Sequence, residues 1–411
     1  MSETYSYKAV LTSDDLFGGL SRIREATPIA WCDEGFWLIT RHADVQAFAK
    51  RSGEFSDHVT SDPTQMTGYA ELRPYGQSGG PLESWITNKL LYTDPPKHTE
   101  LRRPVQPEFT RKAIENSAGE IAGWICRTTL ASLNRSSEFD VVTDFAVPYV
   151  VGVSTKLLGI PESDVPQVYL WLTEMAKADN GAHMMNSGQV RASGDAISQL
   201  RDYLRHVAGR RRDGEPVPPQ LLLAPAGHES QLDEVRIDRM LEMLAGTSSA
   251  VGTIVTSFAA LATARDQWAR LKSRSVQTSV AVEELLRYTS VASGGTRFVT
   301  EPFTLHSVEF KPGDTVELDM RSANRDPRVF ADPDVLDLSR SPNPHLVFGD
   351  GRHRCIGEHV VRVYTQAAIE GMVEAMSELS LPQGPPVLLE DRTGILGYEQ
   401  LKAAASWEPA A

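Results

Sequence analysis

The residues best suited to chemistry lie in one short segment, His345–Gly357, which we call the cysteine loop and which reads HLVFGDGRHRCIG. Its three glycines allow tight turns and a close approach of the backbone to a flat ligand, and turned N–H groups beside the Cys355 sulfur would tune a thiolate. Arg352 and Arg354 add positive charge that favours the deprotonated form, and the helix expected next would add its dipole. Taken alone, the segment is also compatible with an inert cysteine in a glycine-rich turn.

The rest of the composition excludes several classes of protein. Cys32 and Cys126 lie in apolar contexts and are expected in the core, and three scattered cysteines build neither a disulfide framework nor a zinc cluster. A net charge of −13 with no basic stripe beyond residues 210–212 argues against nucleic-acid binding. No apolar run reaches the length of a membrane span, and the N-terminus has no signal pattern. We expect a cytoplasmic protein.

The elements that must position Cys355 are mostly helical. Residues 28–32 and 35–40 predict a hairpin, and residues 95–288 follow mostly helical patterns. One helix over about residues 235–264 would span ~45 Å, long enough to cross the molecule. After Thr296 the period shifts to two, which predicts strands joined by a turn at 311–314, and a second strand region lies near 386–407. We expect residues 1–411 to form one mainly α domain with small β-sheets.

Five positions of the cysteine loop match a known motif. Phe348, Gly351, His353, Cys355 and Gly357 fit Phe-x-x-Gly-x-(Arg/His)-x-Cys-x-Gly, and in this the segment is similar to the signature of the cytochrome P-450 family. The resemblance covers about residues 20–400. It implies the cytochrome P-450 fold, in which a long central helix covers haem b, the loop from Phe348 and Gly349 onward lies on the proximal side, and the Cys355 thiolate ligates the iron.

Further motifs follow the order of that family. Glu284 and Arg287 stand three residues apart on one helix face, and Arg340 ends the segment that follows. Alone, such a pair is most often a surface ion pair; by the resemblance these three residues form a buried network that braces the cysteine loop.

His98 and Arg102 resemble the His-x-x-x-Arg segment of the family, which holds a haem propionate. By the same resemblance Arg297, His345 and His353 are further propionate partners. Imidazole and cationic donors suit carboxylates because charge-assisted hydrogen bonds are strong. For Arg297 an ordinary surface role is an equally good interpretation.

The central helix departs from the family pattern Ala-Gly-x-(Asp/Glu)-Thr. Here Ala245 is kept, while Ser248 and Ser249 replace the acid and the threonine that deliver protons during oxygen activation. Ser249 can relay a proton but cannot store one as a carboxyl can. Either the enzyme is a mono-oxygenase in which water or substrate completes the relay, or it couples radicals of an aromatic or cyclic-dipeptide substrate without inserting oxygen. A non-catalytic haem-binding partner or sensor is the alternative of another class.

The resemblance also places the substrate pocket and the partners. The substrate is expected to be a small natural product. Its pocket would be lined by Met66, Tyr69, Leu241, Leu244, Ala245, Ala292, Ser293, Gly294, Ile395 and Leu396. Electrons would come from a separate ferredoxin and ferredoxin reductase, which we expect to bind a basic patch formed by Arg103, Arg111, Lys112, Arg352, Arg354 and Arg362. A monomer is expected.

Overall fold

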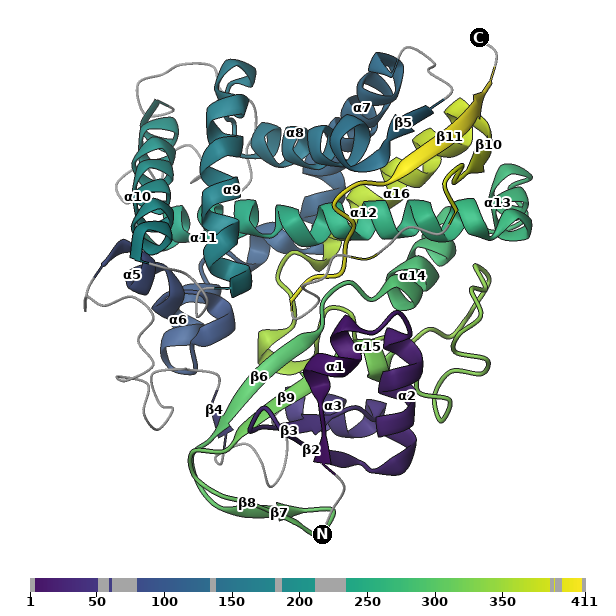
Figure 1. The fold of residues 1–411 in the computed structure, drawn as a ribbon. Coiled ribbons are helices and arrows are strands. Elements are labelled where there is room, and N and C mark those ends of the chain that lie inside the picture. Colours follow the sequence, from purple (N-terminus) through teal and green to yellow (C-terminus); the bar gives the residue numbers. More distant parts are fainter. Residues whose placement is uncertain are drawn as a thin grey trace.

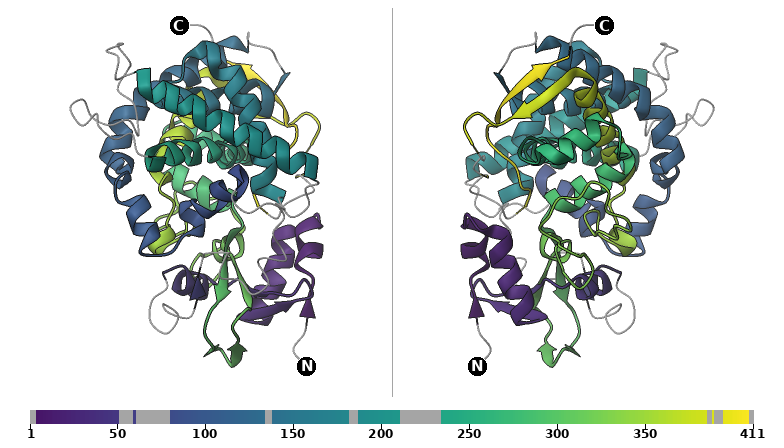
Figure 2. Two further views of the ribbon diagram at one scale, coloured as in Figure 1. Left: turned by 90° about the vertical axis from the view of Figure 1, so that its left-hand side faces the viewer. Right: turned by 90° about the vertical axis from the view of Figure 1, so that its right-hand side faces the viewer.

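The computed structural model shows a large helical part packed against a smaller part built on a sheet (Figure 1). It describes residues 4–50, 59–60, 80–133, 138–181, 187–210, 234–384, 388 and 394–408. The side views show the N-terminal helices, in purple, beside the sheet and away from the helical part (Figure 2). The expected mainly α architecture with small sheets is confirmed.

The helices are α1 Tyr7–Thr12, α2 Leu16–Ala26, α3 His42–Lys50, α5 Pro81–Thr87, α6 Lys97–Arg102, α7 Arg111–Ser132, α8 Val147–Leu157, α9 Val165–Gly181, α10 Ser187–Arg210, α11 Glu234–Ala245, α12 Thr247–Thr263, α13 Arg265–Lys272, α14 Thr278–Thr289, α15 Met320–Ala323 and α16 Glu358–Ala375. The strands are β1 Thr4–Tyr5, β2 Ile29–Cys32, β3 Trp37–Ile39, β4 Val59–Thr60, β5 Glu138–Asp140, β6 Gly294–Val299, β7 Phe303–Leu305, β8 Val308–Phe310, β9 Thr315–Asp319, β10 Met376–Ser380 and β11 Lys402–Trp407.

The larger sheet has the order β1-β2-β3-β9-β6-β4. The hairpin predicted over residues 28–40 is confirmed, because β2 and β3 pair antiparallel with Ile29 opposite Ile39. The strands expected after Thr296 are also present. The turn at 311–314 leads into β9, which pairs with both β3 and β6, and so joins the N-terminal hairpin to the chain that follows α14.

The central helix is interrupted where a single helix was expected. α11 and α12 continue one another across the molecule (Figure 1), but Gly246 between them has φ −64° and ψ −10°. The N–H of Ala250 reaches the Gly246 carbonyl oxygen only at 3.3 Å. Among the described residues, Glu234–Thr263 is the helix long and apolar enough to cross a membrane, and 61% of its apolar window is buried inside the fold. That burial is typical of a core helix.

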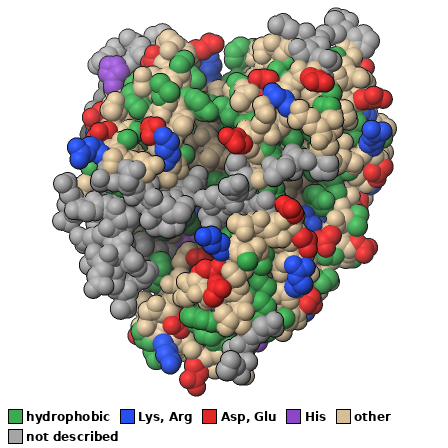
Figure 3. All heavy atoms as spheres, in the orientation of Figure 1, with side chains coloured by type: hydrophobic (Ala, Val, Ile, Leu, Met, Phe, Trp, Pro, Cys, Tyr) green, Lys and Arg blue, Asp and Glu red, His purple; other side chains and the backbone are tan. Residues whose placement is uncertain are grey.

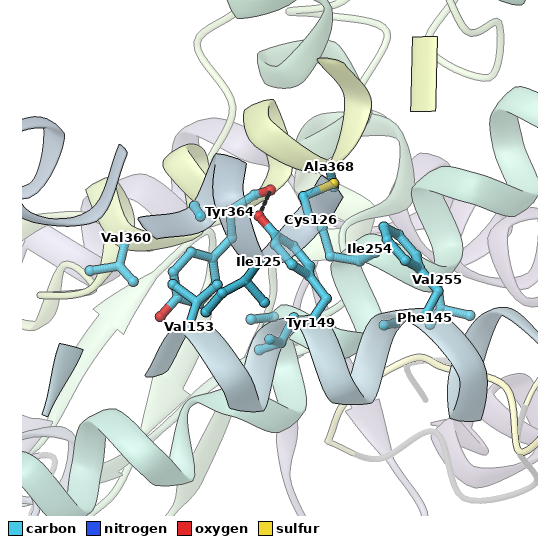
Figure 4. Close-up of a cluster of buried hydrophobic side chains, with 14 of the residues drawn as sticks. Ile125, Cys126, Phe145, Tyr149, Val153, Ile254, Val255, Val360, Tyr364 and Ala368 are labelled. Carbon is cyan, nitrogen blue, oxygen red and sulfur yellow. Dashed lines mark hydrogen bonds between the residues drawn. The ribbon is translucent and has the colours of Figure 1, made fainter. Parts of the chain in front are cut away.

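The core lies where α7, α8, α12 and α16 meet (Figure 4). Gly371 lets α16 approach α7, since a Cβ there would lie 2.5 Å from the Cys126 sulfur. The Tyr149 hydroxyl donates to the main-chain oxygen of Tyr364 at 2.8 Å, so α8 is tied to α16 as well. Cys126 and Cys32 are buried, and burial raises the pKa of each thiol to about 12. Both are therefore the inert core residues that were expected.

Candidate functional site

The cysteine loop is folded tightly by its glycines. Gly349 and Gly351 have φ of +69° and +68°, a region that glycine enters without strain. A Cβ on Gly351 would lie only 2.6 Å from the carbonyl oxygen of Ala49 in α3. The Cys355 N–H donates to the carbonyl oxygen of Phe348 at 2.8 Å and closes the loop. The glycine-rich sequence thus holds Cys355 in a fixed position just before α16.

Cys355 is exposed, and its side chain forms part of the wall of a cavity. Burial raises the pKa of the thiol, whereas the Gly357 N–H bonded to the sulfur lowers it. Glu358 raises the pKa further, and the charges of Arg102 and Arg362 lower it, with burial prevailing. A thiol of this kind becomes a thiolate when it coordinates a metal ion, because the ion supplies positive charge at the sulfur itself.

Of the two arginines expected to favour the thiolate, Arg354 does so through its charge, although this effect does not outweigh burial of the thiol. The pKa of Cys355 is raised, and the Arg354 guanidinium forms a two-bond ion pair with Glu358 at 2.8 and 2.7 Å. Arg352 lies exposed at the surface. The charge of Arg354 is therefore shared with Glu358, while Arg352 faces solvent.

The predicted network of Glu284, Arg287 and Arg340 is formed. Glu284 and Arg287 are fully buried, and two guanidinium nitrogens of Arg287 each lie 2.8 Å from a carboxylate oxygen. Arg340 Nε adds a contact to Glu284 at 3.0 Å, and Asn343 Nδ2 adds another at 3.1 Å. Arg287 also donates to the Asn324 carbonyl oxygen at 2.9 Å. Every carboxylate oxygen and most guanidinium nitrogens therefore have partners.

This network is connected to the cysteine loop. The side-chain oxygen of Asn324 accepts the Leu346 N–H at 2.6 Å. Glu283 accepts hydrogen bonds from His345 at 3.0 Å and from Arg362 at 2.7 and 3.0 Å. Burial alone would raise the pKa of Glu283, but these two partners lower it to about 2. His345 thus ties the cysteine loop to Glu283, the residue before Glu284, a contact that was not predicted, and its proposed role toward a propionate rests on Nδ1 alone.

Three of the predicted propionate partners lie together beside the loop. The rings of His98 and His353 are 4.8 Å apart. Arg102 Nη1 donates to the carbonyl oxygens of Arg352 and Arg354 at 2.9 and 2.8 Å, so it also fixes the cysteine loop. Burial and the charge of His353 lower the pKa of His98 to about 4, so its imidazole is neutral. The buried Nε2 of His98 has no hydrogen-bond partner among the described residues.

Arg297 occupies a different element. It lies buried on β6 and donates from Nη1 to the Thr296 carbonyl oxygen at 2.8 Å. The neighbouring Glu317 has its pKa raised to about 7 by burial, which the Thr296 hydroxyl and Arg297 oppose. The role of Arg297 toward a propionate stays a prediction.

A cavity of about 130 Å³ opens between α11–α12 and α16. Residues of the cysteine loop, of α16 and of the central helix form most of its walls. The lining residues are Phe109, Ser154, Arg239, Glu242, Met243, Gly246, Thr247, Ser249, Ala250, Cys355, Ile356, Gly357, Val360, Val361 and Tyr364. Cys355 and Ser249 therefore face one shared space, as the sequence predicted.

Two residues of the central helix that were predicted for the substrate pocket do not line this cavity, and their role toward a substrate stays a prediction. Leu241 and Leu244 are fully buried in the main core and are not among the residues that line this cavity. Glu242 and Met243 line it instead, together with Gly246 one turn later. The central helix therefore presents Glu242, Met243 and Gly246 to the cavity that Cys355 shares. Ala245 is half-buried against the core.

The other predicted pocket residues lie on two chain segments, 292–294 and 395–396, which pair with each other and pack against α12. Ala292 forms an isolated bridge with Ile395, and the Leu396 N–H donates to the Val291 carbonyl oxygen at 2.7 Å. A Cβ on Gly252 of α12 would lie 2.8 Å from the main-chain oxygen of Leu396. These segments, which include Ser293 and Gly294, stay a predicted part of the pocket. Met66 and Tyr69 lie outside the described residues.

The hydroxyl groups that replace the usual acid and threonine are bonded within their own helix. Ser249 Oγ donates to the Gly246 carbonyl oxygen at 2.9 Å, and Ser248 Oγ donates to the Ala245 carbonyl oxygen at 3.2 Å. Only Ser249 of the two lines the cavity. Ser248 therefore reaches the cavity only through its neighbours.

The residues present fit a haem. A cysteine sulfur opens into a cavity beneath a long helix, and the buried His98 Nε2 lies nearby without a partner among the described residues. An N–H donor in that position suits a carboxylate such as a propionate. Together these features are those of a haem-thiolate protein, in which Cys355 would hold the iron and the haem would supply oxygen activation.

Comparison with known proteins agrees with this class. A family model described as Cytochrome P450 matches residues 262–400. The chain is 30% identical over 383 residues, 90% of each chain, to the polyketide biosynthesis cytochrome P450 PksS of Bacillus subtilis (strain 168). It is 29% identical over 385 residues to the nocardicin C N-oxygenase of Nocardia uniformis subsp. tsuyamanensis, covering 91% of this chain and 90% of that one. The solved structure of PksS superposes with a TM-score of 0.80 at 27% identity, over 96% of this chain and 99% of that one.

The chain therefore belongs to the cytochrome P450 family. It is an oxidoreductase, and its family implies a haem-thiolate cofactor.

Proposed function

We propose that this chain is a haem b mono-oxygenase that oxidises a small natural product with electrons from a separate ferredoxin and ferredoxin reductase. The observation that carries the proposal is the shared cavity, into which Cys355 opens from one side and Ser249 from the other. Cys355 would ligate the iron, and His98, Arg102 and His353 would hold a propionate. The bound haem would supply the activation of molecular oxygen.

The chain's own residues set the conditions of that reaction. α12 covers the cavity with mostly buried side chains, which limits the entry of water. The Ser249 hydroxyl donates to Gly246 at 2.9 Å, so it must leave this bond before it can donate a proton into the cavity. Because no carboxyl stands at position 248, we infer that a water molecule or a group of the substrate completes the proton path.

The same departure supports a second candidate, an oxidase that couples an aromatic or cyclic-dipeptide substrate without inserting oxygen. Both serine hydroxyls are engaged within the helix, so the acid and threonine of the family pattern for oxygen insertion have no free counterpart here. Turnover under ¹⁸O₂ separates the two candidates once a substrate is found: label in the product supports the mono-oxygenase, and an unlabelled coupled product supports the oxidase.

The electron donor would bind beside the cysteine loop. Of the six basic residues predicted for this patch, Arg111, Arg354 and Arg362 form ion pairs with Glu115, Glu358 and Glu283. Arg103, Lys112 and Arg352 are exposed and form no ion pair within the described part of the chain. On the face shown in Figure 3, by contrast, acidic and basic side chains are interspersed. The three unpaired cations are the residues that would attract an acidic ferredoxin.

The test is reconstitution with a ferredoxin, its reductase and NADPH. The proposal expects substrate-dependent oxygen consumption that needs both electron-transfer proteins. Oxygen consumption and product formation that stay at background with every donor, in a protein whose haem is reduced by dithionite, would contradict it.

A further inference from the structure

The cavity contains a buried ion pair that the chemistry described above does not use. Arg239 and Glu242 lie three residues apart on α11, and both line the cavity. Arg239 Nη1 lies 3.3 Å from Glu242 Oε2, with 2% of the arginine side chain and 16% of the glutamate side chain exposed. Charged residues are rarely buried to this degree unless they are paired or bind something.

The pairing of Arg239 is incomplete. Its Nη2 donates to the Asn88 carbonyl oxygen at 2.6 Å. Its buried Nε and Nη1, however, make no hydrogen bond within the described part of the chain. Leaving a buried charged donor without an acceptor is costly, so this guanidinium calls for an acceptor supplied from the cavity.

Glu242 is held in place and still has acceptor capacity. Its Oε1 accepts the Leu90 N–H at 2.7 Å, and a carboxylate offers about four lone-pair sites. Burial raises the pKa of Glu242 to about 7, which Arg239 and the Leu90 N–H oppose. When ionised, Glu242 lies beside the Arg239 guanidinium at 3.3 Å and still has acceptor capacity toward the cavity.

The combination of charges selects one class of ligand. A carboxylate would satisfy Arg239 but would be repelled by ionised Glu242, and an amine would satisfy Glu242 but would be repelled by Arg239. A neutral amide has an acceptor oxygen next to an N–H donor, which matches both residues at once. A wholly apolar ligand would leave the Arg239 donors without partners.

We propose that Arg239 and Glu242 form the substrate-anchoring site of this enzyme and that its substrate carries a secondary amide or lactam, whose oxygen accepts from Arg239 and whose N–H donates to Glu242. This assignment rests on the proposed function, since it places the substrate in the cavity that Cys355 shares. It also favours a peptide-derived substrate over a hydrocarbon.

The experiment uses the haem-loaded protein and four imidazoles that differ only in their side arm. Binding of each imidazole to the iron is followed by the shift of the Soret band, so no substrate need be known. The probes are N-acetylhistamine (amide), histamine (amine), 3-(imidazol-4-yl)propionate (carboxylate) and 4-propylimidazole (apolar), together with N-acylated amines on longer tethers to cover reach.

The wild-type protein is expected to bind its best amide probe about ten-fold more tightly than 4-propylimidazole, as expected for hydrogen bonds to charged groups. Arg239→Met/Glu242→Gln, which removes both charges and keeps an acceptor for Leu90, should abolish that preference. Asp238→Asn is the matched control on α11: it breaks an ion pair with Arg201 (2.8 Å) and should keep the preference.

Two results would overturn the anchor alone: equal affinity of the wild type for amide and apolar probes, or a preference for the carboxylate or the amine. If the reduced carbon monoxide complex of the same wild-type preparation lacked the thiolate band, the proposed haem-thiolate site would fail, and the anchor with it.

Discussion

The two sides of the cavity are built in opposite ways. On the side of the cysteine loop, Glu284 accepts contacts from Arg287, Arg340 and Asn343, all within 3.2 Å. On the side of the central helix, Arg239 keeps buried N–H groups without acceptors among the described residues. The Glu284 carboxylate is satisfied by the protein itself, whereas Arg239 has hydrogen-bonding capacity left for a ligand.

This difference indicates that the Glu284 network has a structural role and that Arg239 is available to bind a ligand. A satisfied buried network holds the cysteine in a single geometry, because moving any member leaves a charge unpaired. Buried polar groups without partners destabilise the ligand-free protein. A ligand that supplies the missing partners removes this cost and so binds more tightly. We therefore expect substitutions on the loop side to act on folding and those on the helix side to act on binding.

The largest effect is expected at the buried pair. Glu284→Gln leaves Arg287 without its counter-charge, and breaking such a pair costs ~3–5 kcal/mol, a large part of the stability of an ordinary protein. Urea unfolding measures the loss. Arg111→Ala breaks the exposed pair with Glu115 and serves as the control, with its midpoint almost unchanged. An equal loss of unfolding free energy in Glu284→Gln and Arg111→Ala would contradict a special structural role of the buried pair.

A pH-dependent effect is expected next, at Glu242. Its pKa in the folded protein, about 7, lies above the ordinary value of 4.5, so the folded state binds this proton more tightly than the unfolded state. The wild type should therefore lose stability relative to Glu242→Gln as the pH rises from about 4.5 through 7, by up to ~3 kcal/mol. Chemical unfolding at several pH values measures the difference between the two proteins. A difference independent of pH over this range would show that Glu242 is not perturbed.

A smaller effect is expected at the glycines of the cysteine loop. Gly351→Ala combines a left-handed φ of +68° with a Cβ 2.6 Å from the Ala49 oxygen, and the conformation alone costs ~1–2 kcal/mol. Gly384 has φ +82° but nothing within 4 Å of its Cβ, so Gly384→Ala reports the conformational cost without the clash. Thermal unfolding should show the larger loss for Gly351→Ala. A loss as small as that of Gly384→Ala would mean that α3 does not constrain the loop.

The smallest effect is expected on the rate of reduction. Arg103→Glu/Lys112→Glu should slow electron transfer from an acidic ferredoxin about ten-fold at low ionic strength, and the deficit should shrink as salt screens the charges. Stopped-flow reduction at two salt concentrations measures both. Rates and salt dependence equal to those of the wild type would place the docking site elsewhere.

Local sequence patterns predicted the parts of the molecule that local chemistry determines. The hairpin over residues 28–40, the glycine turns before Cys355 and the pair Glu284–Arg287 depend on neighbours a few residues away. The bonds of Glu283 to His345 and Arg362 join residues 62 and 79 positions apart, a distance that no local pattern encodes.

The central helix shows the same limit. Its apolar period was visible, but neither its interruption at Gly246 nor the presence of Arg239 and Glu242 at the cavity was predicted. The sequence nevertheless contained an indication of this site. Glu242 lies in the otherwise apolar run Met240–Leu244, and a carboxylate in a buried run must be paired or bind a ligand.

The most direct test of the central claim is the spectrum of the reduced carbon monoxide complex, recorded for the wild type and for Cys355→Ala. We predict a Soret band at the position typical of thiolate ligation in the wild type and its loss in the variant, with His98→Ala keeping the thiolate band but losing haem more readily. A wild-type band at the position typical of imidazole ligation, unchanged in Cys355→Ala, would contradict the assignment of Cys355 as the iron ligand.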